Sequence, residues 1–151
     1  KGLLTSAKTS VTTAAADLKA DELVTLVYNL KRPYRKNAAF LVNDRTLASI
    51  RKLKDNNGAY LWQPSYQMGE PDRLLGYPVH TSAYMPAAAA GKIALAFGDY
   101  AYYNIGDRGT RSLQELKELF AGNGMVAYLM KERVDGKLVL AEAVQLLKIK
   151  G

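Results

Sequence analysis

Cysteine is absent from the 151 residues, and histidine occurs once, as His80. Without cysteine the chain can form neither disulfides nor thiolate metal sites, and a single histidine excludes a multi-histidine zinc site. The longest apolar runs, residues 85–91 and 93–97, are far shorter than the roughly 20 residues that span a bilayer. We therefore expect no transmembrane helix.

Motifs for catalysis and for nucleotide binding are also missing. No serine lies in a G-x-S-x-G pattern, and Gly98, Gly106 and Gly109 are spaced too loosely for a phosphate-binding loop. His80 lies among Val79, Thr81 and Ser82 in a predicted strand, where a histidine commonly forms only local hydrogen bonds. We predict that the protein is not an enzyme and binds no cofactor; a hydrolase using His80 is a minor alternative.

What is present is apolar content and positive charge. Apolar residues make up 48% of the chain, which suffices for one compact domain with a core. The net charge of +7 would permit contact with nucleic acid. Its densest clusters, residues 31–36 and 51–54, lie at predicted helix ends, where cations complement the helix dipole. We interpret them as solvated helix ends rather than as a binding groove.

Local patterns in the first half predict two helices around a strand. Residues 1–16 are rich in Ser, Thr and Ala and are interpreted as an extended lead-in. Residues 17–30 repeat leucine and valine at helical spacing, and Pro33 follows. The apolar run 38–42 predicts a buried strand, and Asn43 and Asp44 predict the start of a helix that ends near residues 55–58.

The second half predicts mostly strands. Strands are expected at residues 59–62, 77–83, 92–97 and 100–105, with a polar loop at 63–72. Residues 112–121 carry leucines at helical spacing and predict a helix. Residues 125–134 and 138–149 predict two strands joined by a hairpin turn at Asp135-Gly136. The expected fold class is α+β, a mixed sheet flanked by helices.

Tyrosines 100, 102 and 103 raise an alternative function. Aromatic side chains on a strand near basic residues can stack on unpaired bases, which would make the chain a basic module that binds single-stranded nucleic acid. The same rings serve equally well at the edge of a core or at a protein interface. We favour packing.

Three segments, taken in order, resemble the tailed-phage major capsid family of the Hong Kong 97 type. They are LLGYPVHTSAYMP at 74–86, IALAFGDYAYYNIGDR at 93–108 and KERVDGKLVLAEAVQLL at 131–147. Upstream, AAFLVNDRTLASIRKLKDNNGAYLW at 38–62 is similar to the family's strand, helix and turn. The resemblance covers roughly residues 20–150.

This resemblance implies a Hong Kong 97-type fold, mainly the axial domain with part of the peripheral domain. We expect an extended lead-in at 1–16, an axial-domain-like core at 17–110 and a peripheral-domain-like return segment with a hairpin at 111–151. The family's N-terminal arm, extended loop and spine helix are not matched, so we expect the sequence to be part of a longer protein. Asn123 and Lys131 do not fit the family's crosslinking pattern, and we predict no crosslink.

The function implied is that of a structural subunit of a phage or prophage head, assembling into hexamers and pentamers that enclose DNA. An encapsulin-like shell protein is the related alternative. The expected partners are copies of itself, with scaffolding and portal proteins as further candidates, non-specific contact with packaged DNA at most, and no membrane. The expected location is the virion, with the host cytoplasm during assembly.

Predicted subunit contacts lie in two places, because loops on a rigid scaffold usually meet partners. The first is the basic turn after the first predicted helix, and the second is the polar loop that follows residue 62. The residues are Arg32, Arg35, Lys36, Gln63, Tyr66, Gln67 and Glu70.

Overall fold

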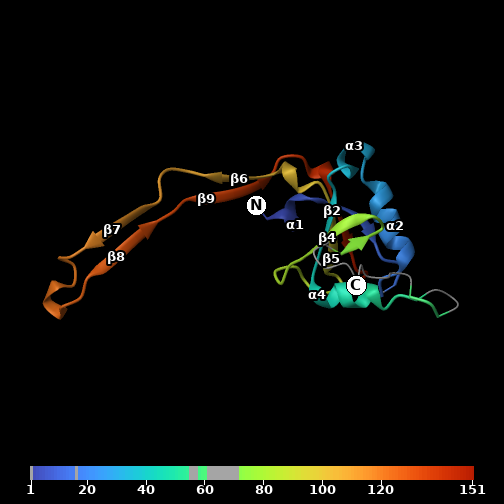
Figure 1. The fold of residues 1–151 in the computed structure, drawn as a ribbon, viewed down its shortest axis with the longest axis horizontal. Helices are drawn as coiled ribbons and strands as arrows, with labels where there is room; N and C mark the ends of the chain where they lie inside the picture. The colour runs from blue at the N-terminus through green and yellow to red at the C-terminus, as the bar shows by residue number, and fades with distance from the viewer. Residues whose placement is uncertain (1, 16, 55–57, 61–71) are drawn as a thin grey trace.

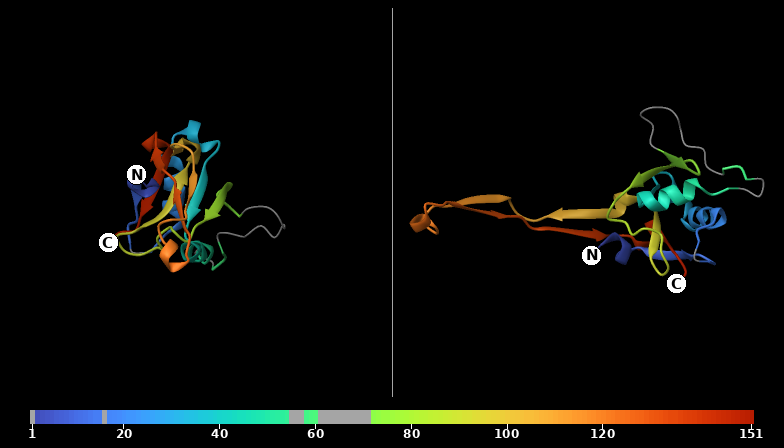
Figure 2. Two further views of the ribbon diagram at one scale, coloured as in Figure 1. Left: turned by 90° about the vertical axis from the view of Figure 1, so that its left-hand side faces the viewer. Right: turned by 90° about the horizontal axis from the view of Figure 1, so that it is seen from below.

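A rounded body and a long thin arm make up the molecule (Figure 1). The computed structural model describes residues 2–15, 17–54, 58–60 and 72–151. Both chain termini lie in the body, and the arm leaves the body and returns to it (Figure 2). The arm is therefore an excursion of the chain between two strands of the body.

A six-stranded mixed sheet forms the centre of the body, in the order β1-β10-β5-β2-β4-β3. β5 is antiparallel to both of its neighbours, β10 and β2, whereas β1 runs parallel to β10 and β4 parallel to β2. The strands are β1 (Lys8–Thr12), β2 (Ala39–Val42), β3 (Arg73–Leu74), β4 (Tyr77–Thr81), β5 (Ile93–Gly98) and β10 (Val144–Lys148).

Two helices cover one face of this sheet. α2 (Ala20–Asn29) buries Leu23, Leu26 and Val27, and the Glu22 carboxylate accepts hydrogen bonds from the backbone N–H groups of Ala14 and Lys19 at its start. α4 (Asp44–Arg51) buries its own apolar side and begins at Asn43, whose Oδ1 accepts from the Arg45 N–H at 3.0 Å. The bonds from the Lys19 and Arg45 N–H groups satisfy backbone donors that a helix start leaves free, and the bond from Ala14 ties the preceding segment to α2.

Smaller elements complete the fold. Two single-turn helices are α1 (Leu3–Ser6) and α3 (Arg32–Arg35), and three 3₁₀ turns are η1 (Tyr100–Tyr102), η2 (Ala121–Asn123) and η3 (Ala141–Ala143). The arm contains β6 (Tyr103–Asp107), β7 (Ser112–Leu116), β8 (Ala127–Lys131) and β9 (Val134–Leu138). In the arm, β6 pairs with β9 and β7 pairs with β8, both antiparallel.

Side chains fill both faces of the central sheet. On the helix-covered face Phe40 and Phe97 lie with ring centroids 4.4 Å apart, and Tyr77 meets Phe97 edge-on at 5.0 Å. On the other face Ala96 and Leu146 pack in a second cluster that receives residues from α1 and from the base of the arm. Because β5 is buried on both faces, it is a continuous apolar run rather than an alternating one.

Gly98, at the end of β5, lies against the backbone of residues 143 and 144. A Cβ atom there would lie 2.3 Å from the Ala143 carbonyl oxygen and 2.6 Å from the Val144 Cα. Both atoms belong to backbone that runs directly beside β5, so neither can move as a side chain could. Only glycine fits this position.

Several sequence predictions are confirmed. The strand expected at 38–42 is β2, and the strands expected at 77–83 and 92–97 are β4 and β5. The helix expected after Asn43 is α4, but it ends at Arg51 and not near residues 55–58. The helix expected at 17–30 is α2, although α3 then begins with Pro33 in its first turn. The 1–16 lead-in contains α1 and the paired strand β1. Residues 55–57 of the turn expected at 55–58 and residues 61–62 of the strand expected at 59–62 lie outside the described residues, and Tyr60 forms a single antiparallel bridge with Lys54.

Two expected strands form only in part, because residues 100–102 of the strand expected at 100–105 form η1 and residues 141–143 of the strand expected at 138–149 form η3. Two further predictions, both about the arm, are wrong. Residues 112–121 are not a helix, because Ser112–Leu116 forms β7 and pairs with β8 along its whole length. Asp135-Gly136 is not a hairpin turn, because both residues lie inside β9. A Cβ at Gly136 would lie 2.4 Å from the Tyr103 Oη, so the tyrosine ring occupies space that a larger residue would take.

Candidate subunit interface

Catalytic geometry does not appear in the described part of the chain. His80 is exposed on β4, and among the residues that the structure describes no group of three or more His, Asp or Glu side chains could hold a metal ion. None of the described helices is both long enough and apolar enough to cross a membrane.

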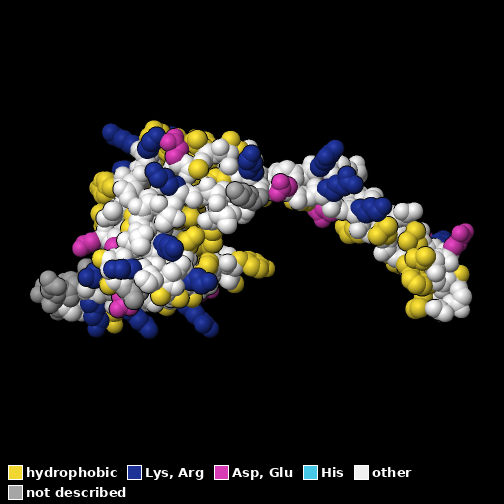
Figure 3. Space-filling model, turned by 180° about the vertical axis from the view of Figure 1, so that it is seen from behind, with side chains coloured by type: hydrophobic (Ala, Val, Ile, Leu, Met, Phe, Trp, Pro, Cys, Tyr) yellow, Lys and Arg dark blue, Asp and Glu magenta, His cyan; other side chains and the backbone are white. Residues whose placement is uncertain are grey.

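The arm exposes an unusual amount of apolar surface. Figure 3 shows apolar side chains gathered along its outer part. We call this set the arm surface, and its members are at least 39% exposed: Ile105, Leu113, Leu119, Phe120, Met125, Val126, Tyr128, Leu129, Met130 and Val134. Monomeric soluble proteins rarely expose contiguous apolar patches of large size, and such patches mark interaction sites.

Strand register assigns the outer apolar residues to two faces. Leu113 lies opposite Met130 and Glu115 opposite Tyr128, so Leu113, Tyr128 and Met130 share one face of the β7–β8 ribbon. Leu116 lies opposite Ala127, and Leu129 shares their face. A two-stranded ribbon has no core between these faces, so both are available to neighbouring molecules.

The base of the arm is firmly attached to the body. Leu138 is buried, and the Tyr103 ring packs with it against the second cluster. The Val139 N–H donates to the Tyr102 carbonyl oxygen at 2.9 Å, and the Tyr100 hydroxyl donates to the Ala96 carbonyl oxygen at 3.1 Å. Burial raises the pKa of Tyr100 well above its ordinary value, so its hydroxyl keeps its proton.

An arginine connects the two ribbons of the arm. Arg111 Nε donates to Glu132 Oε1 at 2.9 Å, and a terminal nitrogen of the same side chain lies 3.3 Å from Asp107 Oδ2. The Arg108 N–H donates to the Arg133 carbonyl oxygen at 2.9 Å across the same junction. These contacts join the end of β6 to the segment after β8.

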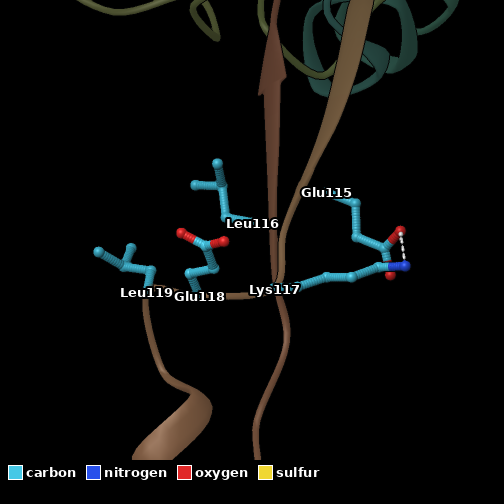
Figure 4. A pocket seen from close by; sticks show the side chains of 5 residues that line it. All are labelled: Glu115, Leu116, Lys117, Glu118 and Leu119. Atoms are coloured by element: carbon cyan, nitrogen blue, oxygen red, sulfur yellow. Dashed lines mark ion pairs between the residues drawn. The ribbon is translucent and has the colours of Figure 1, made fainter.

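A depression of about 630 Å³ lies near the tip of the arm and is lined by residues 115–119. In Figure 4, Leu116, Glu118 and Leu119 extend to one side of the strand, and the Glu115–Lys117 ion pair extends to the other. That pair joins Lys117 Nζ to Glu115 Oε2 at 3.5 Å. The structure gives the Glu118 carboxylate no hydrogen bond or ion pair with any described residue. It lies between two leucines with its charge unneutralised.

The basic turn predicted from the sequence has mixed roles. Arg35 donates from Nε to the Leu30 carbonyl oxygen and from a terminal nitrogen to the Tyr28 carbonyl oxygen, at 2.7 and 2.8 Å, and lies over the Tyr28 ring. It therefore caps the end of α2. Arg32 and Lys36 are exposed, and neither forms an ion pair with any residue that the structure describes.

A polar contact beside this turn was not predicted. Glu142 in η3 accepts a hydrogen bond from Lys31 Nζ at 2.6 Å and another from the Tyr34 hydroxyl at 2.7 Å. The hydrogen bonds from Lys31 and then Tyr34 lower the pKa of Glu142, and the hydrogen bond to Glu142 raises the pKa of Tyr34. The contact joins the α3 turn to η3, which follows the arm. The two are more than a hundred residues apart in sequence, so no local sequence pattern predicts the contact.

The remaining sequence candidates do not form a site in the described residues. Gln63, Tyr66, Gln67 and Glu70 lie outside the described residues, so their predicted contacts stay predictions. The tyrosines of the proposed stacking platform are used in packing. Tyr100 and Tyr103 pack against the second cluster, and Tyr102 meets Tyr34 edge-on at 5.5 Å.

The arm surface escaped the sequence analysis altogether. A usable signal was present, since residues 125–130 place several large apolar side chains in a predicted strand with no second apolar stretch assigned to cover them. An uncovered apolar strand is a mark of an interface.

A body built on a mixed sheet, with a long arm whose apolar side chains lack partners, defines a structural protein that acts through contacts with other molecules. The family model described as the phage capsid family matches residues 1–149. The chain belongs to this family.

Solved structures agree with this assignment. The capsid of an empty GTA particle, computed with C5 symmetry, is 36% identical to the chain, with a TM-score of 0.83, and the match covers 99% of this chain and 56% of that one. The capsid of the native GTA particle gives 35% identity and a TM-score of 0.84 over the same shares. A chain from Gordonia phage Cozz, 17% identical over 100% of this chain and 52% of its own, has a TM-score of 0.67 and shows the shared fold.

The chain thus spans about 56% of the length of the GTA capsid chains that it matches. No curated protein matches it.

Proposed function

We propose that the chain is part of a major capsid protein, the structural subunit of a phage or prophage icosahedral head. Copies of the subunit assemble into hexamers and pentamers, and the closed shell encloses DNA. Family membership over residues 1–149 and the similarity to GTA capsid chains support this proposal.

One observation carries the proposal, and it is the uncovered arm. Two-stranded ribbons are at best marginally stable in water, and a third strand or a packing partner is normally needed. Here the outer ribbon β7–β8 has no such partner within the described chain, yet it exposes Leu113 (69%), Tyr128 (66%) and Met130 (64%). A shell supplies the missing partners, because every subunit is surrounded by copies of itself.

The body and the arm have different roles in this proposal. The body, with its two-sided core, is the stiff part and corresponds in this proposal to the axial domain, whereas the arm corresponds to the peripheral domain. The boundaries expected from the sequence, 17–110 and 111–151, stay predictions, and β10 returns to the body sheet from the second of these ranges. Many modest contacts of arms with neighbouring copies would close the shell, as multivalency allows.

Partners beyond the subunit itself belong to the same proposal. The capsid family implies a place in the virion, and we propose that assembly occurs in the host cytoplasm with scaffolding and portal proteins. Packaged DNA would meet the shell without sequence recognition, because the tyrosines that could stack on bases are engaged in packing: Tyr100 and Tyr103 against the second cluster and Tyr102 against Tyr34.

Expression of the full-length protein tests the proposal directly. We expect negative-stain electron microscopy to show closed particles of uniform diameter, and sedimentation to show species far larger than a monomer. A soluble full-length protein that remains monomeric at high concentration, with and without a co-expressed scaffolding protein, would refute it.

A further inference from the structure

The arm tip and the basic turn have complementary chemistry. At the tip the Glu118 carboxylate, unneutralised by any described residue, lies between the side chains of Leu116 and Leu119 in an open depression of about 630 Å³ (Figure 4). A carboxylate with apolar walls suits a long cationic side chain, since the aliphatic stem packs on the leucines while the charged end reaches the carboxylate. The depression is thus shaped for a lysine or an arginine.

We propose that this depression receives the basic turn at Arg32 and Lys36 of a second copy of the chain. The inference rests on the proposed function, and it adds to it which part of one subunit meets which part of another.

Charge argues against a contact between two identical tips. Residues 112–130 contain two glutamates and one lysine, a net charge of −1, whereas the whole chain carries +7. The rest of the chain therefore carries +8. Two tips brought together would repel, and a tip brought to a basic surface would be attracted, since like charges placed together disfavour a contact and opposite charges favour it.

Among the basic surfaces, the turn at α3 offers cations that are free to pair. Lys31 already contacts Glu142, and Arg35 already caps α2. Arg32 and Lys36 are exposed and have no ion pair with the described residues. Tyr28, which is 70% exposed and lies beneath Arg35, adds apolar surface next to these cations. The turn therefore offers a cation for the Glu118 carboxylate and an apolar side chain that can pack against Leu116 and Leu119.

Such a contact is heterologous, because it joins two different surfaces of the same chain. Heterologous contacts continue from copy to copy and close into a ring or a larger assembly, whereas a contact between identical patches stops at a dimer. The geometry is suited to a subunit that must meet several neighbours.

Charge reversal in the full-length protein tests the pairing. Glu118→Arg alone, and Arg32→Glu with Lys36→Glu alone, should each raise the protein concentration needed for assembly by about tenfold, because each places like charges in contact. The three changes combined should return this concentration to within about threefold of the wild-type value, since the opposite charges are restored in reverse.

Two controls give the test its specificity. Glu115→Gln, on the other side of the same strand, should change the assembly concentration less than about twofold, because an exposed ion pair contributes little. Combining Glu118→Arg with Lys148→Glu, at a basic position on a different part of the body, should not restore assembly.

Each outcome decides something. Unchanged assembly in Glu118→Arg, or rescue by Lys148→Glu as good as rescue at the basic turn, would overturn the proposed pairing while leaving the shell function intact. A folded wild-type protein that does not assemble at all would overturn the shell function and the pairing together. Urea denaturation of the dissociated variants should match the wild type, since the altered side chains are exposed.

Discussion

Replacing three exposed residues of the arm should abolish assembly without harming the fold. Leu113, Tyr128 and Met130 share one face of the outer ribbon and are 69%, 66% and 64% exposed. Full burial of such a side chain contributes about 1.5–3 kcal/mol, so covering the exposed two thirds contributes about 1–2 kcal/mol each. Changing all three to threonine therefore removes up to about 3–6 kcal/mol from each arm contact, or roughly two to four orders of magnitude in its association constant.

The stability of the single subunit should hardly change. These side chains are already in water, and exposed substitutions usually alter the free energy of unfolding by about 0.5 kcal/mol or less each. Threonine also keeps a high preference for strands. We expect urea denaturation of the dissociated subunit to give nearly the wild-type midpoint.

Sedimentation velocity and electron microscopy of the full-length variant provide the assay. The matched control is Leu113→Ile, Tyr128→Phe and Met130→Leu, which keeps apolar side chains of similar size on this face and should still assemble. Closed particles from the threonine variant at wild-type concentrations would show that the arm face is not an interface. Loss of the urea transition would show instead that the arm holds the subunit together.

Three further predictions concern the body. Gly98→Ala should lower the free energy of unfolding by about 3 kcal/mol or more, because its Cβ would lie 2.3 Å from a backbone carbonyl oxygen, whereas Gly122→Ala, with nothing within 4 Å, should be nearly neutral in the same urea titration. Asn43→Ala should cost about 1–2 kcal/mol through loss of the α4 cap, and a loss below about 0.5 kcal/mol would contradict that role. Because Lys31 lowers the pKa of Glu142 below its ordinary 4.5, the pair stabilises the fold above that pH and less as the pH falls through the lowered pKa. The difference in urea midpoint between wild type and Glu142→Gln should therefore shrink in acid; a difference that is independent of pH would refute the ion pair.

Local chemistry made the central part of the body predictable. The apolar run of β2 is followed at once by Asn43, a residue whose side chain suits the first position before a helix. All the information needed for this strand and helix lies within about fifteen residues. The same holds for β5, whose unbroken apolar run is typical of a strand buried on both faces.

The arm was mispredicted because its side chains pack against no core, so the local sequence pattern does not determine its secondary structure. Leu113, Leu116 and Leu119 are spaced as on one face of a helix, yet in β7 the first two lie on opposite faces of a ribbon that is apolar on both sides. The dipeptide Asp135-Gly136 by itself favours a turn. In the structure both residues pair with β6, and the Tyr103 ring packs over Gly136. Pairing with a distant strand overrode the local preference in both places.

The candidate interface was likewise only partly predictable from the sequence. The sequence picked out the basic turn by its charge, but only the folded chain shows that Arg35 is occupied in capping α2 while Arg32 remains exposed. No sequence motif predicts the depression at Glu118. Its lining residues, 115–119, run from the end of β7 to the segment that follows it, where pairing with β8 has ended.

The amino-acid sequence alone determined that thiolate, multi-histidine and phosphate-loop chemistry are excluded, and it placed the strand and helix at residues 38–51, because composition and nearest-neighbour patterns suffice for both. Tertiary structure decided that β1 joins β10 and that residues 103–138 leave the body as an uncovered arm. Strand pairing between residues far apart in the chain sets which side chains meet each other and which remain for a neighbour, and that choice depends on the whole fold.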